Sequence, residues 1–258
     1  MPEGDTIHRT ANRLRPALAG QPLVRFEALR LVGDQPRPGE VIDAVEAVGK
    51  HLLIKFPRRL VLHTHMKMTG SWHLYRTNER WRERRHLARV VIEVPGWVAV
   101  CFAAPVVQTY RDIAGQPSPI AHLGPDLCLP DLDVGVVMAR HRRLAGEWPT
   151  MAEALLDQRI ACGVGNVFKS EVLWACRVSP FERPEQVDDR LTEQLWRTAS
   201  KQLRRNLVGG PRTTVPGGLA VYGRERQPCR ACGSIIEIRH HGEQARSTYW
   251  CPNCQPDD

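Results

Sequence analysis

Two short cysteine pairs lie near the end of the chain, Cys229-Arg230-Ala231-Cys232 and Cys251-Pro252-Asn253-Cys254, with eighteen residues between them. This spacing is typical of a four-cysteine zinc site, because each Cys-x-x-Cys turn presents two thiolates at tetrahedral angles. Between the pairs, residues 234–239 and 247–250 alternate like the strands of a hairpin. Two disulfides or four free thiols are the alternatives. We predict a zinc finger over residues 219–255 that holds one structural Zn²⁺, since four thiolates leave no open position for catalysis. The ligands would be Cys229, Cys232, Cys251 and Cys254.

The region before the finger, residues 132–208, has helical spacing of its apolar residues over 136–144, 151–156, 167–175 and 191–207. A Gly- and Pro-rich connector over 209–218 joins it to the finger.

Within the helical region, the segment from Asp157 to Glu171 indicates a helix, a glycine-rich turn and a second helix. The backbone N–H groups of residues 163–166 would lie at the start of that second helix, which suits an anion. Asn166 and Lys169 add side-chain donors there. The alternative is an ordinary glycine-rich connection between packed helices.

The first half of the chain has a different pattern. Residues Thr6 to Leu18 place apolar side chains on one helical face, with Asp5 or Thr6 as the expected N-cap. Short strand-like runs follow over residues 24–26, 51–56, 60–63 and 88–94. We therefore predict an α+β multidomain protein. Its parts are an N-terminal β-sandwich with an N-terminal helix (2–122), a helical domain (132–208) and the finger (219–255).

Composition narrows the class of partner. The formal net charge is +8, which favours a polyanion because Lys and Arg displace counterions from phosphates. No apolar run approaches the roughly 18–20 residues of a membrane span. The acidic, polar start does not resemble a secretory signal. A cytoplasmic protein is expected, in which the four remaining cysteines pack in cores; these are Cys101, Cys128, Cys162 and Cys176.

The N-terminus carries a candidate nucleophile. Removal of Met1 would leave Pro2 with a secondary α-amine, whose reference pKa of about 7.7–8.0 leaves far more neutral amine at pH 7 than a lysine has. A neutral amine is what Schiff-base formation needs, and Glu3 beside it could transfer protons. A disordered start is the alternative. The helix that begins directly after Asp5 argues against it.

These landmarks, taken in order, resemble the formamidopyrimidine-DNA glycosylase/endonuclease VIII family. The resemblance is carried by Pro2-Glu3-Gly4, by Gly49-Lys50-His51-Leu52-Leu53, by residues 155–171 and by the C-terminal cysteines. Together they cover nearly the whole chain. The segment 155–171 is similar to the family's helix–two-turn–helix DNA-binding element.

The resemblance implies a role for each matching residue. Pro2 would attack C1′ of the damaged nucleotide, and Glu3 would protonate the sugar ring oxygen. Lys50 would contact the phosphate beside the lesion; a solvated lysine at a strand end is the alternative. Asn166 and Arg246 would grip the phosphates that flank the flipped nucleotide, with Lys169 nearby.

The resemblance also assigns a loop. Residues 65–72 are similar to the loop that fills the space left by the extruded base, with Met68 as the wedge. A core gap-filling role for Met68 is the alternative. His63 and His65 share a strand face, and we expect them to be solvated or hydrogen-bonded rather than metal-binding.

Two departures from the family pattern bear on substrate choice. Asp5-Thr6 stands where the family usually has a second glutamate, so Asp5 substitutes for it or that carboxylate is dispensable. The turn after Phe102 reads Ala103-Ala104-Pro105 and lacks the Arg-Phe wedge of the formamidopyrimidine branch. The resemblance therefore favours the endonuclease VIII branch and oxidised pyrimidines.

The predicted function is that of a bifunctional DNA glycosylase and abasic-site lyase of base excision repair, which completes β,δ-elimination. Damaged DNA is the expected partner, and the enzyme is expected to be a monomer without a nucleotide cofactor. A non-enzymatic zinc-finger protein that binds damaged DNA is one alternative, but it leaves Pro2-Glu3 unexplained. An abasic-site lyase without glycosylase activity is the other.

Overall fold

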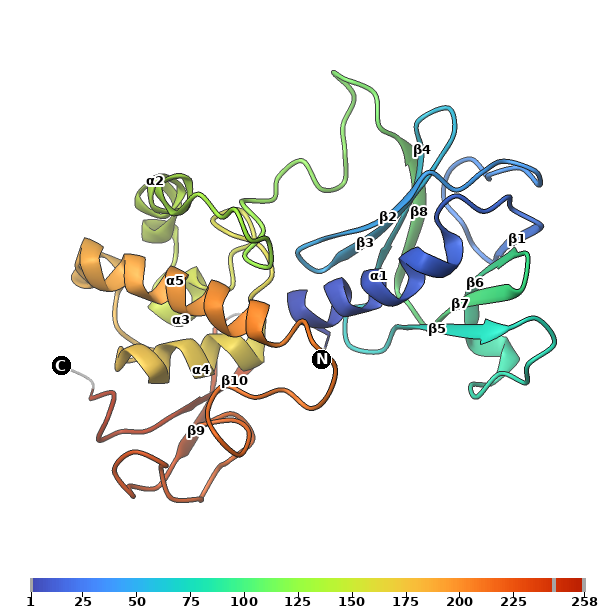
Figure 1. Cartoon of the computed structure of the whole chain (residues 1–258). Helices are drawn as coiled ribbons and strands as arrows, with labels where there is room; N and C mark the ends of the chain where they lie inside the picture. The colour runs from blue at the N-terminus through green and yellow to red at the C-terminus, as the bar shows by residue number, and fades with distance from the viewer. Residues whose placement is uncertain (1, 243–244, 257–258) are drawn as a thin grey trace. The chain divides into compact units, whose positions relative to one another are not determined.

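The computed structural model describes residues 2–242 and 245–256. The chain forms two compact units, Met1–Ala121 and His122–Asp258. The first runs from blue to green in Figure 1, and the second from green to red. Among the described residues, no helix is long and apolar enough to cross a membrane.

The first unit opens with helix α1 (Gly4–Leu18), which confirms the predicted helix and begins two residues earlier. The expected N-cap was wrong. The backbone carbonyl of Glu3 accepts hydrogen bonds from the N–H groups of Thr6 (3.0 Å) and Ile7 (3.1 Å), so Glu3 is the N-cap. Asp5 is buried in the first turn instead. The helix therefore starts directly after the residue pair that carries the candidate chemistry.

Two antiparallel four-stranded sheets make up the rest of this unit. One has the order β1 (Arg25–Ala28), β6 (Ala88–Val94), β7 (Trp97–Phe102) and β5 (Ser71–Arg76). The other has the order β2 (Ala44–Val48), β3 (His51–Phe56), β4 (Leu60–His65) and β8 (Val106–Arg111). A short 3₁₀ helix, Arg85–Leu87, precedes β6.

The two sheets share one hydrophobic core. Ile54 and Leu62 enter it from one sheet, Ile92 and Ala99 from the other, and Leu14 from α1. This common core confirms the predicted β-sandwich with its helix. The predicted strands 51–56 and 88–94 are confirmed residue for residue.

The second unit is helical up to its last segment. Its α-helices are α2 (Val134–Leu144), α3 (Met151–Ala154), α4 (Asn166–Cys176) and α5 (Asp189–Arg205), with 3₁₀ turns at Ala145–Glu147 and Pro184–Gln186. Phe168 of α4 and Trp196 of α5 are both fully buried in its core. Gly163, in the turn before α4, has φ +120°, a conformation that side-chain-bearing residues rarely adopt. The glycine-rich turn and the second helix of the segment 157–171 are therefore confirmed, whereas the helix predicted at its start is wrong, because α3 ends at Ala154 and turns follow it.

The unit ends in a two-stranded hairpin, β9 (Glu237–His241) and β10 (Arg246–Trp250). Trp250 pairs with Glu237, which places the strand ends beside the cysteine turns. Strand β10 packs on helix α4. The predicted finger hairpin is confirmed, with its first strand shifted toward the C-terminus.

Candidate functional site

The start of the chain is fixed in place. Pro2 is half-buried, and the side chains of Glu3 and Asp5 are fully enclosed, each 0% exposed. Burial of a carboxylate is costly unless the group is hydrogen-bonded or paired. The amino-terminal end of α1 favours negative charge at both positions because the helix dipole is positive there. The structure therefore places a carboxylate next to Pro2 on an ordered helix start, and the disordered alternative is wrong.

Lys50 lies at the tip of the β2–β3 hairpin. Val48 pairs with His51, so Gly49 and Lys50 form a two-residue turn. Gly49 takes φ +54°, which suits the first central position of such a turn. Lys50 is half-buried. Its charge is felt nearby, because burial and then the charges of Lys67 and Lys50 lower the pKa of His65 to about 4.

A hydrogen-bonded group of histidines lies beside this turn. His51 Nδ1 is 2.7 Å from His63 Nε2, and the Gln108 amide nitrogen is 3.0 Å from His63 Nδ1. Burial lowers the pKa of His63 to about 4, so the ring is neutral at pH 7. A neutral His63 that accepts from Gln108 must donate from Nε2 to His51. The expectation of hydrogen-bonded histidines is confirmed for His63 and for His65, whose Nδ1 accepts from the Lys67 N–H at 3.0 Å.

The sequence pattern pointed to His63 and His65 but not to His51, which is the third histidine of this group. The β3–β4 register pairs His51 with His65 and Leu53 with His63. A hairpin turn centred on Arg58 gives this register. That turn was the signal in the sequence that would have placed His51 in the group.

Met68 lies on the loop between β4 and β5. Its side chain is 70% exposed, so the core gap-filling alternative is wrong. The loop is closed at its base. The Gly70 N–H donates to the Met66 carbonyl at 2.8 Å, and a Cβ on Gly70 would lie 2.9 Å from the Cα atoms of Met66 and Ala104. Thr69 Oγ1 also donates to the Ala103 carbonyl at 3.0 Å, which leaves Met68 presented to solvent.

In the second unit, Asn166 and Lys169 join helix α4 to strand β10. Asn166 Nδ2 donates to the Ser247 carbonyl at 2.7 Å. Lys169 Nζ donates to Asn166 Oδ1 at 2.7 Å, to Thr248 Oγ1 at 2.8 Å and to the Ser247 carbonyl at 3.3 Å. Lys169 is only 1% exposed. Its three ammonium donors are thus used within the protein, and it positions Asn166 and β10 in this structure.

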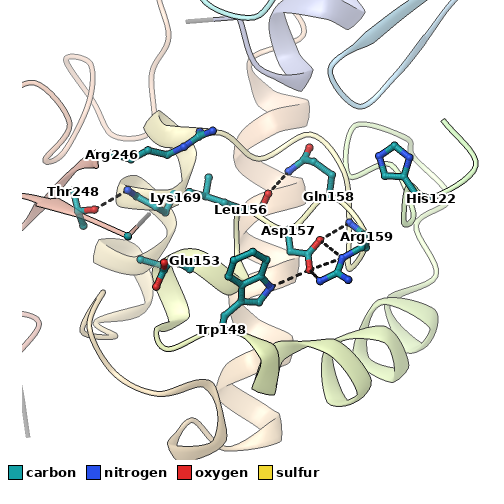
Figure 2. Close-up of a pocket in the computed structure, with 12 residues that line it drawn as sticks. His122, Trp148, Glu153, Leu156, Asp157, Gln158, Arg159, Lys169, Arg246 and Thr248 are labelled. Atoms are coloured by element: carbon teal, nitrogen blue, oxygen red, sulfur yellow. Dashed lines mark hydrogen bonds and ion pairs between the residues drawn. The ribbon is translucent and has the colours of Figure 1, made fainter. Parts of the chain in front are cut away.

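Arg246 begins β10 and lines a cavity of about 330 Å³ together with Lys169 and Thr248. Figure 2 shows these side chains on one side of the cavity and Trp148, Asp157 and Arg159 on another. Arg246 is the first residue of β10, and Asn166 and Lys169 bind the next two residues of that strand. The structure therefore gathers all three residues at the start of β10.

The opposite wall of that cavity carries a charge network around the buried carboxylate of Asp157, in which Arg159 is partly exposed. Trp148 Nε1 donates to Asp157 Oδ2 at 2.9 Å, and Arg159 Nη2 donates to the same oxygen at 2.7 Å (Figure 2). Burial opposes ionisation of Asp157, but the hydrogen bonds from Arg159 and Trp148 outweigh it and lower the pKa of the carboxyl. These hydrogen bonds fix the position of the Asp157 carboxylate in the wall.

The four tail cysteines converge. Their sulfur atoms all lie within 4.8 Å of one another, with Cys229 Sγ 3.9 Å from Cys254 Sγ and Cys232 Sγ 3.4 Å from Cys251 Sγ. A zinc–thiolate tetrahedron with bonds of about 2.3 Å has edges of about 3.8 Å, whereas a disulfide needs about 2.05 Å. None of the four cysteines forms a disulfide. The cluster is consistent with a zinc finger and rules out the disulfide alternative.

The surroundings of the sulfurs support the same conclusion. Trp174 Nε1 and the Ala231 N–H each lie 3.4 Å from Cys229 Sγ, as donors around metal-bound thiolates do. Hydrogen bonds from Ser234 lower the pKa of Cys232 to about 5. Burial and the neighbouring sulfurs raise the pKa of Cys254. A bound cation would relieve the electrostatic repulsion between the thiolates.

One buried residue was not singled out in the sequence. Glu171 is 0% exposed, and its carboxylate accepts from the N–H groups of Ala220 (2.8 Å), Val221 (2.9 Å) and Tyr222 (2.8 Å). It also accepts from the Thr214 hydroxyl. Helix α4 is buried over nearly its whole length, so an acidic residue there was the available signal. Glu171 fixes the segment that leads into the finger.

Comparison with known proteins gives a consistent picture. Residues 1–105 match the formamidopyrimidine-DNA glycosylase N-terminal domain, and residues 123–215 match the formamidopyrimidine-DNA glycosylase H2TH domain. The probable endonuclease 8 2 of Streptomyces coelicolor is 36% identical over 99% of this chain and 94% of its own length. The DNA-(apurinic or apyrimidinic site) lyase Nei2 of Mycolicibacterium smegmatis is 35% identical over 99% of each chain.

Solved structures agree on the fold. MutM (Fpg) from Thermus thermophilus superposes with a TM-score of 0.80 at 28% identity over the full length of both chains. A MutM structure in complex with DNA containing carbocyclic 8-oxo-G gives a TM-score of 0.84 at 20% identity over 99% of this chain. With these matches in fold, length and motif order, the chain belongs to the formamidopyrimidine-DNA glycosylase/endonuclease VIII family.

Proposed function

We propose that this protein is a bifunctional DNA glycosylase and abasic-site lyase of base excision repair. The observation that carries the proposal is the pair Pro2–Glu3, in which the candidate amine directly precedes a fully buried carboxylate at the start of α1. A DNA-binding protein without catalysis leaves the placement of an amine beside this carboxylate unexplained. The relatives named endonuclease 8 and abasic-site lyase support the same activity.

The proposed reaction begins once Met1 has been removed. The neutral Pro2 nitrogen attacks C1′ of the damaged nucleotide, and the base leaves with the electron pair of the glycosidic bond. The proton of the Pro2 nitrogen passes to Glu3, which delivers it to the ring oxygen. The bond between C1′ and that oxygen then breaks, and the nitrogen lone pair forms an iminium between Pro2 and C1′. Loss of a C2′ proton expels the 3′ phosphate, and a second elimination expels the 5′ phosphate. Hydrolysis of the remaining adduct frees Pro2.

The proposed DNA contacts divide between the two units. Lys50 and Met68 belong to the first, with Lys50 on phosphate and the exposed Met68 in the space left by the flipped nucleotide. Asn166 and Arg246 belong to the second and bind the flanking phosphates, since a charged fork and an amide at a helix start both suit an anion. Lys169 supports this site by holding Asn166 against β10.

The proposed substrates are oxidised pyrimidines in damaged DNA. The connection between β7 and β8 consists only of Ala103, Ala104 and Pro105, which leaves no room for a wedge of Arg and Phe. We also propose that the four cysteines hold one structural Zn²⁺. The protein would act as a monomer in the cytoplasm, without a nucleotide cofactor.

Borohydride trapping tests the proposal. An iminium between Pro2 and a lesion-containing duplex would be reduced to a stable adduct whose mass equals that of the chain lacking Met1 plus the reduced DNA fragment. The control is a preparation in which mass spectrometry finds Met1 retained. Equal trapping by that preparation, or binding without any trapping, would exclude the proposed mechanism.

The Mycolicibacterium smegmatis relative, named as an abasic-site lyase, suggests a second candidate, an abasic-site lyase without base excision. A lesion panel separates the two. Cleavage of duplexes with an abasic site but of none with an oxidised base would establish the lyase alone.

A further inference from the structure

A basic groove lies on helix α5, away from the residues discussed above. A cavity of about 730 Å³ runs between the second half of α5 and the segment before α2. Its lining residues are of two kinds. The apolar ones are Cys128, Pro130, Leu132, Val134 and Leu207, and the basic ones are Arg197, Lys201, Arg204 and Arg205, with Ser200 between them.

The orientation of α5 places this groove opposite helix α4. Leu195, Trp196 and Leu203 are fully buried and face the core that α5 shares with α4. Lys201 and Arg204 lie on the opposite, exposed face. Asn166 and Lys169 point from α4 toward β10, so the groove is separate from the proposed phosphate site within this unit.

Three of the four cations in the groove form no ion pair with the described residues, and the fourth does. Arg197 pairs with Glu193 at 2.6 Å. Lys201, Arg204 and Arg205 form no ion pair with any residue in the described ranges 2–242 and 245–256. From residue 194 to residue 224 the sequence holds no Asp or Glu, and the two carboxylates of the other wall, Asp131 and Asp133, alternate with the lining residues Pro130, Leu132 and Val134. Arg204 and Arg205 lie in the last turn of α5, where positive charge is favourable because the carboxyl end of the helix dipole is negative. That effect does not account for the groove beside them.

The apolar floor of the groove distinguishes between two classes of anionic ligand, a nucleic-acid backbone and an acidic peptide. Leu132 and Leu207 are half-buried and pack on the core of this unit, so the core reaches the surface here. A duplex backbone would use the cations but not an apolar floor. A concave site of this volume suits one extended segment with an apolar side chain, since pockets of about 300–1,000 Å³ enclose small ligands.

We infer that this groove binds an acidic peptide segment of a partner protein, with an apolar side chain on the floor and carboxylates on Lys201, Arg204 and Arg205. Opposite charge would set the orientation and the rate of encounter, and burial of the apolar group would hold the segment in place. The groove would recruit the proposed enzyme to a partner without altering its chemistry.

The probe is a labelled peptide of three Asp residues followed by Ile, Ser and Phe, with both ends capped, and fluorescence anisotropy with the full chain is the measurement. Lys201→Ala/Arg204→Ala should weaken binding by about tenfold or more, because charge-assisted contacts are lost. The matched control is Arg142→Ala/Arg143→Ala. It removes two cations from the last turn of α2, and neither of them lines the groove. That control should bind the peptide like the parent.

A second pair of measurements tests the floor without destabilising the protein. A probe with Ile and Phe replaced by Ser should bind at least tenfold more weakly than the parent probe. Trapping on lesion DNA should be unchanged in the Lys201/Arg204 variant, so failure of the groove and failure of the proposed catalysis are separate results. Equal binding of both probes, equal loss in both double variants, or displacement of the peptide by an undamaged oligonucleotide acting on the same residues would overturn the inference.

Discussion

Lys169 Nζ lies 2.7 Å from Asn166 Oδ1, one helical turn away on α4, and the same ammonium group reaches Thr248 Oγ1 of strand β10 at 2.8 Å. The side-chain oxygen of Asn166 is thereby occupied, and its amide nitrogen is directed to the Ser247 carbonyl. A buried cation thus sets the orientation of an amide that the proposed function places on phosphate.

The first prediction concerns this cation. Lys169→Met should lower the free energy of unfolding by about 1–3 kcal/mol, because Asn166 Oδ1 and the Ser247 carbonyl lose a charged donor in a buried place. Lesion-DNA affinity should fall as well. Lys169→Arg is the control and should retain part of both. Denaturant unfolding and DNA titration measure the two effects. Parental stability in the Met variant would contradict the positioning role.

The second prediction concerns the nucleophile. Pro2→Gly should abolish borohydride trapping while DNA binding remains, because the phosphate contacts lie on other residues. The same split should follow from retention of Met1, which blocks the amine. Trapping yield and electrophoretic mobility of the complex, measured on one preparation, give both values. Full trapping by a chain that retains Met1 would remove Pro2 from the mechanism.

The third prediction separates the two stages of the reaction. Glu3→Gln should impair base excision more than strand cleavage at a preformed abasic site, because protonation of the ring oxygen matters most while the base departs. Single-turnover rates on the two duplexes give the comparison. Equal losses on both would indicate that Glu3 serves both stages alike.

The fourth prediction treats the finger as scaffold. Cys251→Ser should release the metal and unfold residues 219–255 locally, since thiolate ligation of zinc contributes on the order of 10 kcal/mol in small peptides. Arg246 would lose its position. Arg246→Ala alone should weaken specific binding by about ten- to a hundredfold, because a charged hydrogen bond contributes roughly 1.5–3 kcal/mol.

The cysteine variant should lose at least as much binding as Arg246→Ala. Zinc content, far-UV dichroism and lesion-DNA affinity of both variants test this. Parental affinity in a variant shown to lack zinc would mean that the finger is dispensable.

The fifth prediction concerns acid. The pKa of His63 lies near 4 in the folded protein, against an ordinary value of 6.5. Below pH 6.5 the unfolded chain therefore binds a proton that the folded chain does not, and stability falls as the pH drops from 6.5 toward 4. The slope is at most about 1.4 kcal/mol per pH unit for this group. His63→Gln should flatten the dependence in unfolding titrations, and an unchanged slope would exclude His63 as its source.

Local pattern was sufficient for much of the fold. Strands 51–56 and 88–94, helix α1 and the finger hairpin follow from alternation and helical spacing alone. The N-cap was missed because Asp5 is a better cap by residue type, whereas burial of its side chain decided the matter. Propensity cannot anticipate which side chain the tertiary structure will enclose.

For the site, too, local sequence pattern predicted some features and tertiary packing decided the others. The cysteines carry their geometry in their spacing, so their convergence was predictable. The contacts of Lys169 with Thr248 and of Glu171 with Val221 join residues far apart in the sequence. Only the packed structure brings such partners together. A cation in a DNA-binding motif is expected to face the DNA, and Lys169 instead faces its own protein.

The carboxylate of Glu171 has a consequence for engineering. Because it accepts from the backbone at 220–222, the finger is docked onto α4 before its first cysteine is reached. A chimaera that exchanges fingers between relatives should therefore be joined after Tyr222 and before Cys229, so that Glu171 keeps its own backbone partners. A junction at 219 would take Glu171 from one parent and the backbone N–H groups of 220–222 from the other, so the carboxylate would have to bind a foreign main chain.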